Sequence, residues 1–190
     1  GSPRLSWNVV ESEGKSQIAA KVEVAADAEF EAIIFDSGKE KDIDSLAFTP
    51  EITLQPYTRY YWRVTVWTDA DEKETSDTAW FETAKMDDPW QADWITPDWE
   101  DAALHPYLRK TISVDNEIAS ARIYACGLGV YELYLNGEKV SDEVLAPGFH
   151  SYNHWLQYQT YDVTDMLQSG ENALGAMLGN GWYKGRFGFS

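Results

Sequence analysis

The sequence has 190 residues, of which 44% are hydrophobic and 14% aromatic, so it is long enough for one or two globular domains, and its aromatic share is typical of half-buried sheets. Its formal net charge of −17 at pH 7 gives a surface that repels phosphate backbones and anionic lipid. Nucleic acid and membranes are therefore not expected as partners, whereas a neutral ligand such as a sugar is unaffected by this charge.

Residues 1–86 are predicted to form a small β-sandwich. Short runs that are apolar, or that alternate between apolar and polar residues, recur between turns: 16–26, 32–38, 46–54, 54–67 and 79–84. A polar, acidic turn region fills residues 68–78, and no stretch has helical spacing. About six or seven short strands with frequent turns are typical of a sandwich.

The segment 54–67, LQPYTRYYWRVTVW, gives the clearest signal in the first half. Its pattern L-x-P-x-T-x-Y-x-W-x-V resembles the corner of fibronectin type III domains, which implies that the hydroxyl of Tyr60 hydrogen-bonds to the backbone just upstream. Alternation places Tyr60 and Trp62 on one face of the strand, together with Val64 and Val66. A sugar-stacking platform is the alternative role for the two aromatic residues, but a corner and a core are the interpretation that we favour.

A polar segment that ends in proline, AKMDDP at 84–89, predicts the boundary between a first domain, 1–86, and a second domain, 87–190. Three tryptophans follow this boundary: Trp90, Trp94 and Trp99. They are candidates for a binding strip. Tryptophans just after a short linker more often pack one domain against its neighbour, and we expect this role here.

The second domain is also predicted to be all-β. Two strand-rich runs are followed by a segment that can form one helical turn and by a last strand: 106–114, 120–142, 161–167 and 170–182. Asn136 and Gly137 predict a hairpin, because both central residues of a type I′ turn need positive φ. About five or six strand candidates are fewer than the roughly eight of a jelly roll, so we predict an incomplete jelly-roll-like sandwich.

The sequence offers no metal or cofactor site. Cys126 is the single cysteine, and its place in a predicted strand favours a buried, inert thiol over a nucleophile. His150 and His154 lie in the loop-like run GFHSYNHW without a third ligand, and His105 is distant in the sequence. Calcium binding through Asp142, Asp162 or Asp165 is the alternative for an acidic β-module, but these residues lack the spacing of a calcium-binding loop.

Five short motifs stand in the second half: G-x-Y-E-L-Y-L-N-G (129–137), D-E-V-L-A-P-G (142–148), Y-Q-T-Y-D-V-T-D (158–165), G-E-N (170–172) and L-G-N-G-W-Y-K-G-R (178–186). In this order and spacing they resemble the amino-terminal β-sandwich of bacterial α-L-rhamnosidases. Residues 59–67 are similar to the fibronectin-like module that precedes that sandwich in the family. The resemblance thus extends over nearly the whole chain.

The resemblance implies that the chain is a non-catalytic N-terminal fragment of a glycoside hydrolase that acts on α-L-rhamnosides. In the family, further strands and a helical (α/α)₆ barrel with the catalytic residues follow the last motif, so we expect the chain to be cut before the barrel. The family resembles inverting glycosidases, whose two carboxyl groups lie about 6.5–9.5 Å apart. Five acidic residues near the motifs are interpreted as strand-edge, turn or cap residues instead: Glu132, Asp142, Glu143, Asp162 and Asp165.

Two roles are open for such a fragment: structural support of the barrel and carbohydrate binding. Sugar rings stack on exposed aromatic side chains, and their hydroxyls need polar partners. The candidates of these types are a cluster near the end of the sequence and one distant tryptophan: Asn180, Trp182, Tyr183, Arg186 and Trp155. The alternative is that Trp182 belongs to the core and that the neighbouring glycines allow a tight bend near the barrel.

The expected partners follow from these two roles. They are rhamnose-containing glycans, the catalytic barrel and, because an interrupted sandwich has unpaired strand edges, a second copy of the chain. A stand-alone carbohydrate-binding or adhesion module is the alternative function. The sequence leaves the localisation open.

Overall fold

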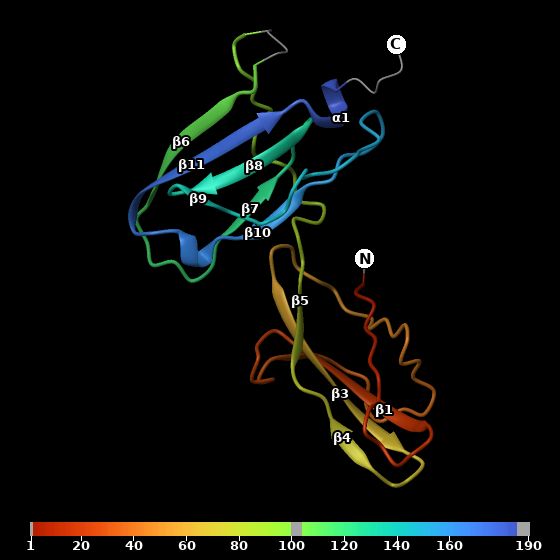
Figure 1. The fold of residues 1–190 in the computed structure, drawn as a ribbon. Helices are drawn as coiled ribbons and strands as arrows, with labels where there is room; N and C mark the ends of the chain where they lie inside the picture. Colours follow the sequence, from red (N-terminus) through yellow and green to blue (C-terminus); the bar gives the residue numbers. More distant parts are fainter. Residues whose placement is uncertain (1, 100–103, 186–190) are drawn as a thin grey trace. The chain divides into compact units, whose positions relative to one another are not determined.

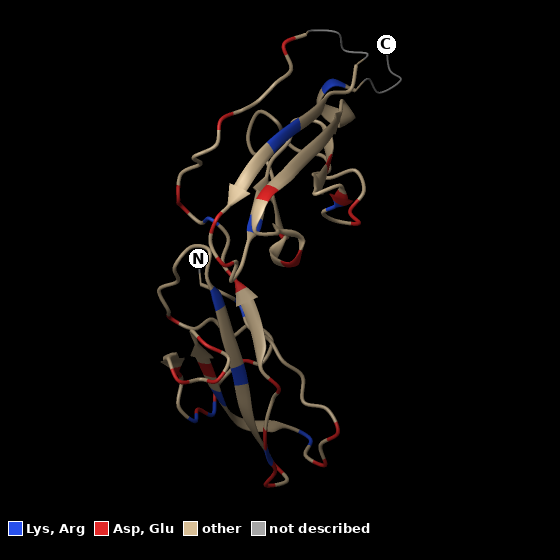
Figure 2. Cartoon of the chain, turned by 90° about the vertical axis from the view of Figure 1, so that its left-hand side faces the viewer, with Lys and Arg blue, Asp and Glu red and all other residues tan. Residues whose placement is uncertain are grey.

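The computed structural model describes residues 2–99 and 104–185, and the chain divides into two compact units, Gly1–Ala92 (unit 1) and Asp93–Ser190 (unit 2) (Figure 1). Both units are all-β, as predicted, and their strands pair antiparallel. The expected boundary after residue 86 lies six residues before this division and stays a prediction. Figure 2 shows Asp and Glu spread over the loops of both units, in keeping with the net charge of −17.

Unit 1 contains one five-stranded sheet. Its strands are β1 (Gln17–Ala25), β2 (Ile33–Asp36), β3 (Arg59–Thr68), β4 (Lys73–Thr75) and β5 (Ala79–Glu82). They follow the order β2-β1-β3-β4, and β5 pairs with the first part of β3. The central strand β3 therefore pairs with β1 along one side and with β4 and β5 along the other.

The core of unit 1 lies on one face of β1 and β3. Val22 pairs with Val64 and Ala20 with Val66, and all four side chains are buried. The alternation seen in the sequence produces this face, because successive side chains of a strand point to opposite sides. The face is covered by extended segments, which Leu5 and Phe48 join through two backbone hydrogen bonds of 2.8 and 3.0 Å.

The predicted corner of unit 1 is confirmed. The hydroxyl of Tyr60 accepts a hydrogen bond from the backbone N–H of Gln55 at 2.8 Å, and the Tyr60 side chain is only 4% exposed. Its ring stacks on Phe81 with centroids 5.4 Å apart. Trp62 packs against the same core, so both aromatic residues are structural rather than a sugar platform.

Two details of unit 1 differ from the prediction. Residues 46–54 were expected to add strands, but they contribute only the isolated bridge of Phe48 with Leu5, and Pro50 in their middle has no N–H to donate. Conversely, β4 lies inside the supposed turn region. It is short and exposed, and Thr75 of β4 contacts Thr65 of β3 through the two hydroxyls at 2.8 Å.

The described residues of unit 2 form two sheets. Its elements are β6 (Tyr107–Val114), β7 (Arg122–Ala125), β8 (Val130–Leu135), β9 (Glu138–Lys139), β10 (Gln159–Asp162), the 3₁₀ turn η1 (Thr164–Met166), β11 (Gly170–Gly179) and α1 (Gly181–Lys184). One sheet has the order β6-β11-β8-β9, and β10 pairs with β7 in the other. The finer jelly-roll-like topology stays a prediction. Among the described residues, no helix is long and apolar enough to cross a bilayer.

The buried residue Tyr131 joins the two sheets of unit 2. It lies on β8, and its hydroxyl donates to Oε1 of Gln159 on β10 and lies 3.3 Å from the carbonyl oxygen of Ala125 on β7. Burial raises the pKa of the Tyr131 hydroxyl above its ordinary value of 10.0, so the group stays a neutral donor. This contact links β8 of one sheet to β7 and β10 of the other.

Glycine and asparagine turns shape the ends of the strands in unit 2. Asn136 and Gly137 have φ values of 53° and 90° and form the predicted hairpin between β8 and β9. The last strand was expected to reach residue 182, but β11 ends at Gly179. Gly181 turns the chain with a φ of 48°, and a side chain there would collide with the backbone at Gly129, 2.9 Å away.

Candidate functional site

The loop between β9 and β10 carries a group of aromatic side chains that meets α1. The ring of Tyr152 lies 5.2 Å from that of Tyr183 on α1, and the His150 ring lies 5.5 Å from Tyr152 and 5.7 Å from Trp155. Phe149 packs edge-on against Tyr152 at 6.2 Å. We call these five residues the aromatic patch. In Figure 1 the loop that precedes β10 rises beside α1.

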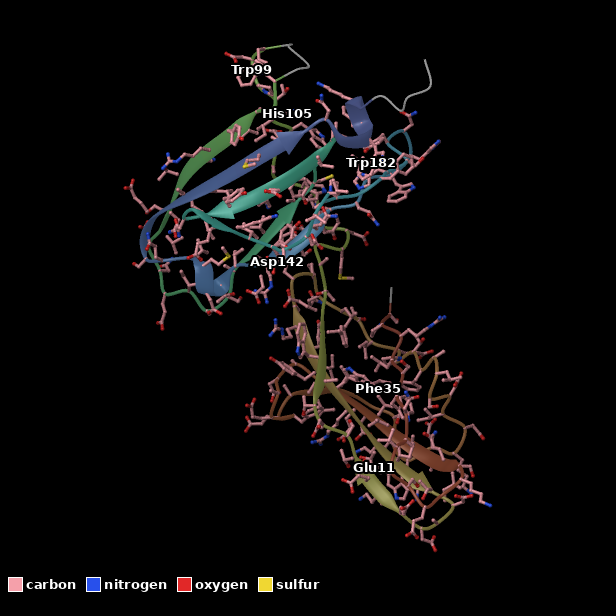
Figure 3. All side chains as sticks on the ribbon, viewed as in Figure 1. Glu11, Phe35, Trp99, His105, Asp142 and Trp182 are labelled. Carbon is pink, nitrogen blue, oxygen red and sulfur yellow. The ribbon has the colours of Figure 1, made fainter. Side chains whose placement is uncertain are left out.

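The structure brings part of the predicted cluster together. Trp155 and Tyr183, which the sequence left far apart, both belong to the aromatic patch and are 51% and 44% exposed. Trp182 lies on α1 (Figure 3) and is half-buried. This degree of burial does not decide between its two predicted roles, a core residue and a ligand contact. Asn180 is half-buried at the start of α1, where its carbonyl oxygen accepts from the N–H of Lys184. Arg186 lies outside the described residues.

Sequence reasoning missed three members of the patch, namely Phe149, His150 and Tyr152. The run GFHSYNHW contains all three and shows four ring-bearing side chains within six residues, from Phe149 to His154, which was the available signal. Phe149 is 66% exposed, whereas His150 is completely buried. Residues 151–155 form a turn in which the N–H groups of His154 and Trp155 both donate to the carbonyl oxygen of Ser151.

The buried polar atoms of the patch lack partners. Both ring nitrogens of His150 and the hydroxyl of Tyr152 are shielded from solvent and form no hydrogen bond. Within residues 2–99 and 104–185, these three are all the buried side-chain nitrogen and oxygen atoms of which this is true. Buried polar groups in native proteins nearly always have a partner, so the patch is unusual within this chain.

Three of the five acidic residues near the motifs form local contacts. Glu132 accepts hydrogen bonds from Lys139 at 2.8 Å and Tyr134 at 2.9 Å, and these lower the pKa of its carboxyl group. Glu143 accepts from the Tyr161 hydroxyl at 3.0 Å, and Asp162 forms an ion pair with Arg122 at 2.8 Å. The strand-edge and turn roles stay predictions, and the expected cap role is not seen, because η1 has Val163 at its N-cap and no side-chain cap hydrogen bond.

The thiol of Cys126 is half-buried and donates to the carbonyl oxygen of Gln157 at 3.3 Å. Burial raises the pKa of this thiol, which disfavours the nucleophilic thiolate. Over the part of the chain that the structure describes, no three histidine, cysteine or acidic side chains come together as a metal site.

The three tryptophans after the predicted boundary are all substantially exposed. The exposed fractions are 46% for Trp90, 64% for Trp94 and 43% for Trp99. The ring of Trp90 lies under the ammonium group of Lys85, 5.6 Å from its centroid. Their expected role in packing one domain against its neighbour stays a prediction.

Two protein families match the chain on either side of residues 88–115. The family described as Rha78A-like, N-terminal immunoglobulin domain matches residues 1–87, and the one described as Alpha-L-rhamnosidase N-terminal domain matches residues 116–190. The chain belongs to the N-terminal region of the α-L-rhamnosidase family. Because the first family is of the immunoglobulin type, the finer fibronectin type III-like assignment of unit 1 stays a prediction.

α-L-Rhamnosidases align with nearly the whole chain. One from Formosa agariphila is 36% identical over 96% of this chain and 22% of its own length. One from Alteromonas sp. is 32% identical over 97% of this chain and 22% of its own length. The chain therefore spans about 22% of the length of the curated relatives that it matches.

Solved α-L-rhamnosidase structures contain the same fold. The enzyme from Dictyoglumus thermophilum matches with a TM-score of 0.86 and 33% identity, over 100% of this chain and 24% of that chain. The enzyme from Aspergillus terreus matches with a TM-score of 0.79 and 30% identity, over 100% of this chain and 23% of that chain. The similarity includes both units.

Proposed function

We propose that this chain is a non-catalytic part of a glycoside hydrolase that acts on α-L-rhamnosides. Its relatives are α-L-rhamnosidases about four times as long, so the region that it shares with them is a minor part of each enzyme. Three acidic residues near the family motifs, Glu132, Glu143 and Asp162, form local ion pairs and hydrogen bonds, which supports a structural use of their carboxylates. Its first role is to support the catalytic part.

The second role is to bind a neutral glycan at the aromatic patch. The observation that carries this proposal is the convergence of Trp155, Tyr152 and Tyr183 from a loop and α1, with two of the rings about half exposed. Sugar faces stack on exposed aromatic rings, and such stacking is unaffected by the strongly acidic surface. Rhamnose is the natural probe, because the relatives are α-L-rhamnosidases.

The test of the non-catalytic assignment is hydrolysis of an aryl α-L-rhamnoside by the purified 190-residue chain. We expect no release of the phenol above the uncatalysed rate. Turnover that persists through purification and is abolished by changing one acidic residue of the chain would contradict the non-catalytic assignment.

The test of the second role is a titration with L-rhamnose. We expect a dissociation constant in the millimolar range, which corresponds to about −4 kcal/mol and is typical of one stacked ring with a few hydrogen bonds. Trp155→Ala and Tyr183→Ala should abolish binding, whereas Trp94→Ala, which removes an even more exposed tryptophan of the same unit, should not. Equal binding by all three variants would place any sugar site elsewhere.

A further inference from the structure

We infer that His150 and Tyr152 form the hydroxyl-recognising end of the glycan site and that Trp155 covers this end in the present structure. This inference rests on the proposed glycan binding at the aromatic patch. It assigns polar contacts to two residues that no motif singled out. It also makes the site a closed one that has to open for the sugar.

The first step is the concentration of unpartnered polar atoms in one place. Both nitrogens of His150 and the hydroxyl of Tyr152 are buried without a hydrogen bond, and the two rings are neighbours at 5.5 Å. Leaving a buried donor or acceptor unpaired costs more than a typical hydrogen bond contributes, so such atoms call for an explanation, and a bound ligand is one. Elsewhere in the described residues, the buried side-chain polar atoms are all satisfied.

The second step is the chemistry that these atoms require. A neutral imidazole has one N–H that donates and one nitrogen that accepts, and a phenolic hydroxyl does both. A ligand hydroxyl also donates and accepts, so adjacent hydroxyls of one sugar ring match His150 and Tyr152 together. A carboxylate or phosphate is disfavoured instead by the net charge of −17, which repels anions.

The third step is access. The indole of Trp155 lies against the His150 ring at 5.7 Å with the planes tilted by 38°, and it is itself half exposed. Trp155 lies on a turn rather than in a helix or strand, so a change of its side-chain rotamer uncovers the imidazole without disrupting a sheet. The displaced indole then offers its face to the sugar whose hydroxyls reach His150.

The binding test uses two conservative variants. His150→Phe keeps a flat ring against Tyr152 and Trp155 but removes both nitrogens, and Tyr152→Phe removes only the hydroxyl. Each should weaken L-rhamnose binding by about tenfold, which equals about 1.4 kcal/mol, while the circular dichroism spectrum stays that of the native chain. Tyr107→Phe, at an exposed position of β6, is the matched control and should bind as the native chain does.

The outcomes separate this inference from the proposed function. If Trp155→Ala abolishes binding while His150→Phe and Tyr152→Phe bind normally, the glycan site stands and the hydroxyl-recognising role is wrong. If the native chain does not bind rhamnose, the proposed site fails and the inference fails with it. If the two phenylalanine variants unfold, the accessibility measurement below decides.

The accessibility measurement needs no variant. Diethyl pyrocarbonate modifies imidazoles, and the chain has three histidines, of which His105 and His154 are exposed. Peptide mapping should show slow modification of His150, and saturating rhamnose should slow it by at least about threefold without affecting His105. A His150 rate that rhamnose leaves unchanged would show that only solvent water meets these nitrogens, and it would overturn the inference.

Discussion

The side-chain amides of Asn136 and Asn172 are joined by a hydrogen bond of 2.8 Å, in which Nδ2 of Asn136 donates to Oδ1 of Asn172. Asn136 lies in the β8–β9 turn and Asn172 near the start of β11, so the contact ties the turn to the central strand of its sheet. Asn172 is 1% exposed and also holds the Gln168 backbone through its N–H and carbonyl groups. The asparagines of the N-G and G-E-N motifs are therefore direct hydrogen-bond partners, which gives both motifs a structural role.

Replacing Asn172 with alanine should destabilise unit 2 by at least about 2 kcal/mol, because several buried backbone and amide groups then lose their hydrogen-bond partner at once. The measurement is the urea midpoint, followed by hydrogen exchange of the β11 amides. Asn116→Ala, at an exposed bend of the same unit, is the control and should change stability by less than about 0.5 kcal/mol. Equal midpoints for both variants would show that the network contributes little.

The corner of unit 1 gives a second prediction. Tyr60→Phe removes only the hydroxyl that accepts from the N–H of Gln55, and it should cost about 1–3 kcal/mol because that N–H then has no partner. Urea unfolding read from the exchange of β3 amides measures the effect. Tyr61→Phe is the matched control on the opposite face of the strand. An unchanged urea midpoint for Tyr60→Phe would show that the corner hydrogen bond does not contribute to the stability of unit 1.

The hydrogen bonds that the Glu72 carboxylate accepts in unit 1, which we call the Glu72 cluster, predict that the stability of this unit depends on pH. The carboxylate of Glu72 accepts from the hydroxyls of Ser12 and Thr68 and from backbone N–H groups of residues 13 and 14, which lowers its pKa to about 2. Because the pKa of the unfolded chain is higher, at 4.5, the stabilising contribution is complete above that value. It should be lost as the pH falls from about 4.5 to 2.

The stabilising role of the Glu72 cluster is tested by comparing Glu72→Gln with Glu74→Gln, which changes an exposed carboxylate on the neighbouring strand β4. Glu72→Gln should flatten the decline of the unfolding temperature between about pH 4.5 and 2. Glu74→Gln should keep the native decline. Parallel curves for the native chain and Glu72→Gln would show that the acid sensitivity of unit 1 has another origin.

Strand β6 is an edge of its sheet and gives a prediction about association (Figure 1). Unpaired edges favour pairing with a second copy, while the net charge of −17 opposes it. We propose that the chain dimerises and that added salt strengthens the dimer, because salt screens the repulsion. Sedimentation velocity should show this, and Thr111→Lys, which adds a third charge beside Arg109 and Lys110, should shift the chain to monomer. A monomer at all concentrations and salt levels contradicts the proposal.

Local signals were sufficient for most of the fold. The Asn136-Gly137 turn and the alternation of β3 predicted a hairpin and a core face, because each depends only on neighbouring residues. Strand β4 was missed because its residues are polar, and it is held by contacts such as Thr65 with Thr75 that a single strand does not reveal. The end of β11 was placed three residues late because the turn at Gly181 is required by its distant neighbour Gly129.

The candidate site was only partly predictable for the same reason. Trp155 and Tyr183 were selected by residue type, but their relation depends on His150 and Tyr152, which connect them across a loop and α1. Burial of His150 could not be read from the run GFHSYNHW, because a loop-like sequence gives no periodicity from which to assign a face. The unpaired nitrogens become visible only in three dimensions.

The most direct test of the account is one titration of the 190-residue chain with an aryl α-L-rhamnoside, followed by nuclear magnetic resonance of both protein and ligand. We predict saturable shifts of the Trp155 indole N–H and of the Tyr152 and Tyr183 rings in the millimolar range, while the glycoside stays intact. A spectrum in which the patch does not respond, or in which free rhamnose accumulates at a rate proportional to the protein concentration, would contradict the central claim of a non-catalytic chain that binds glycan at its aromatic patch.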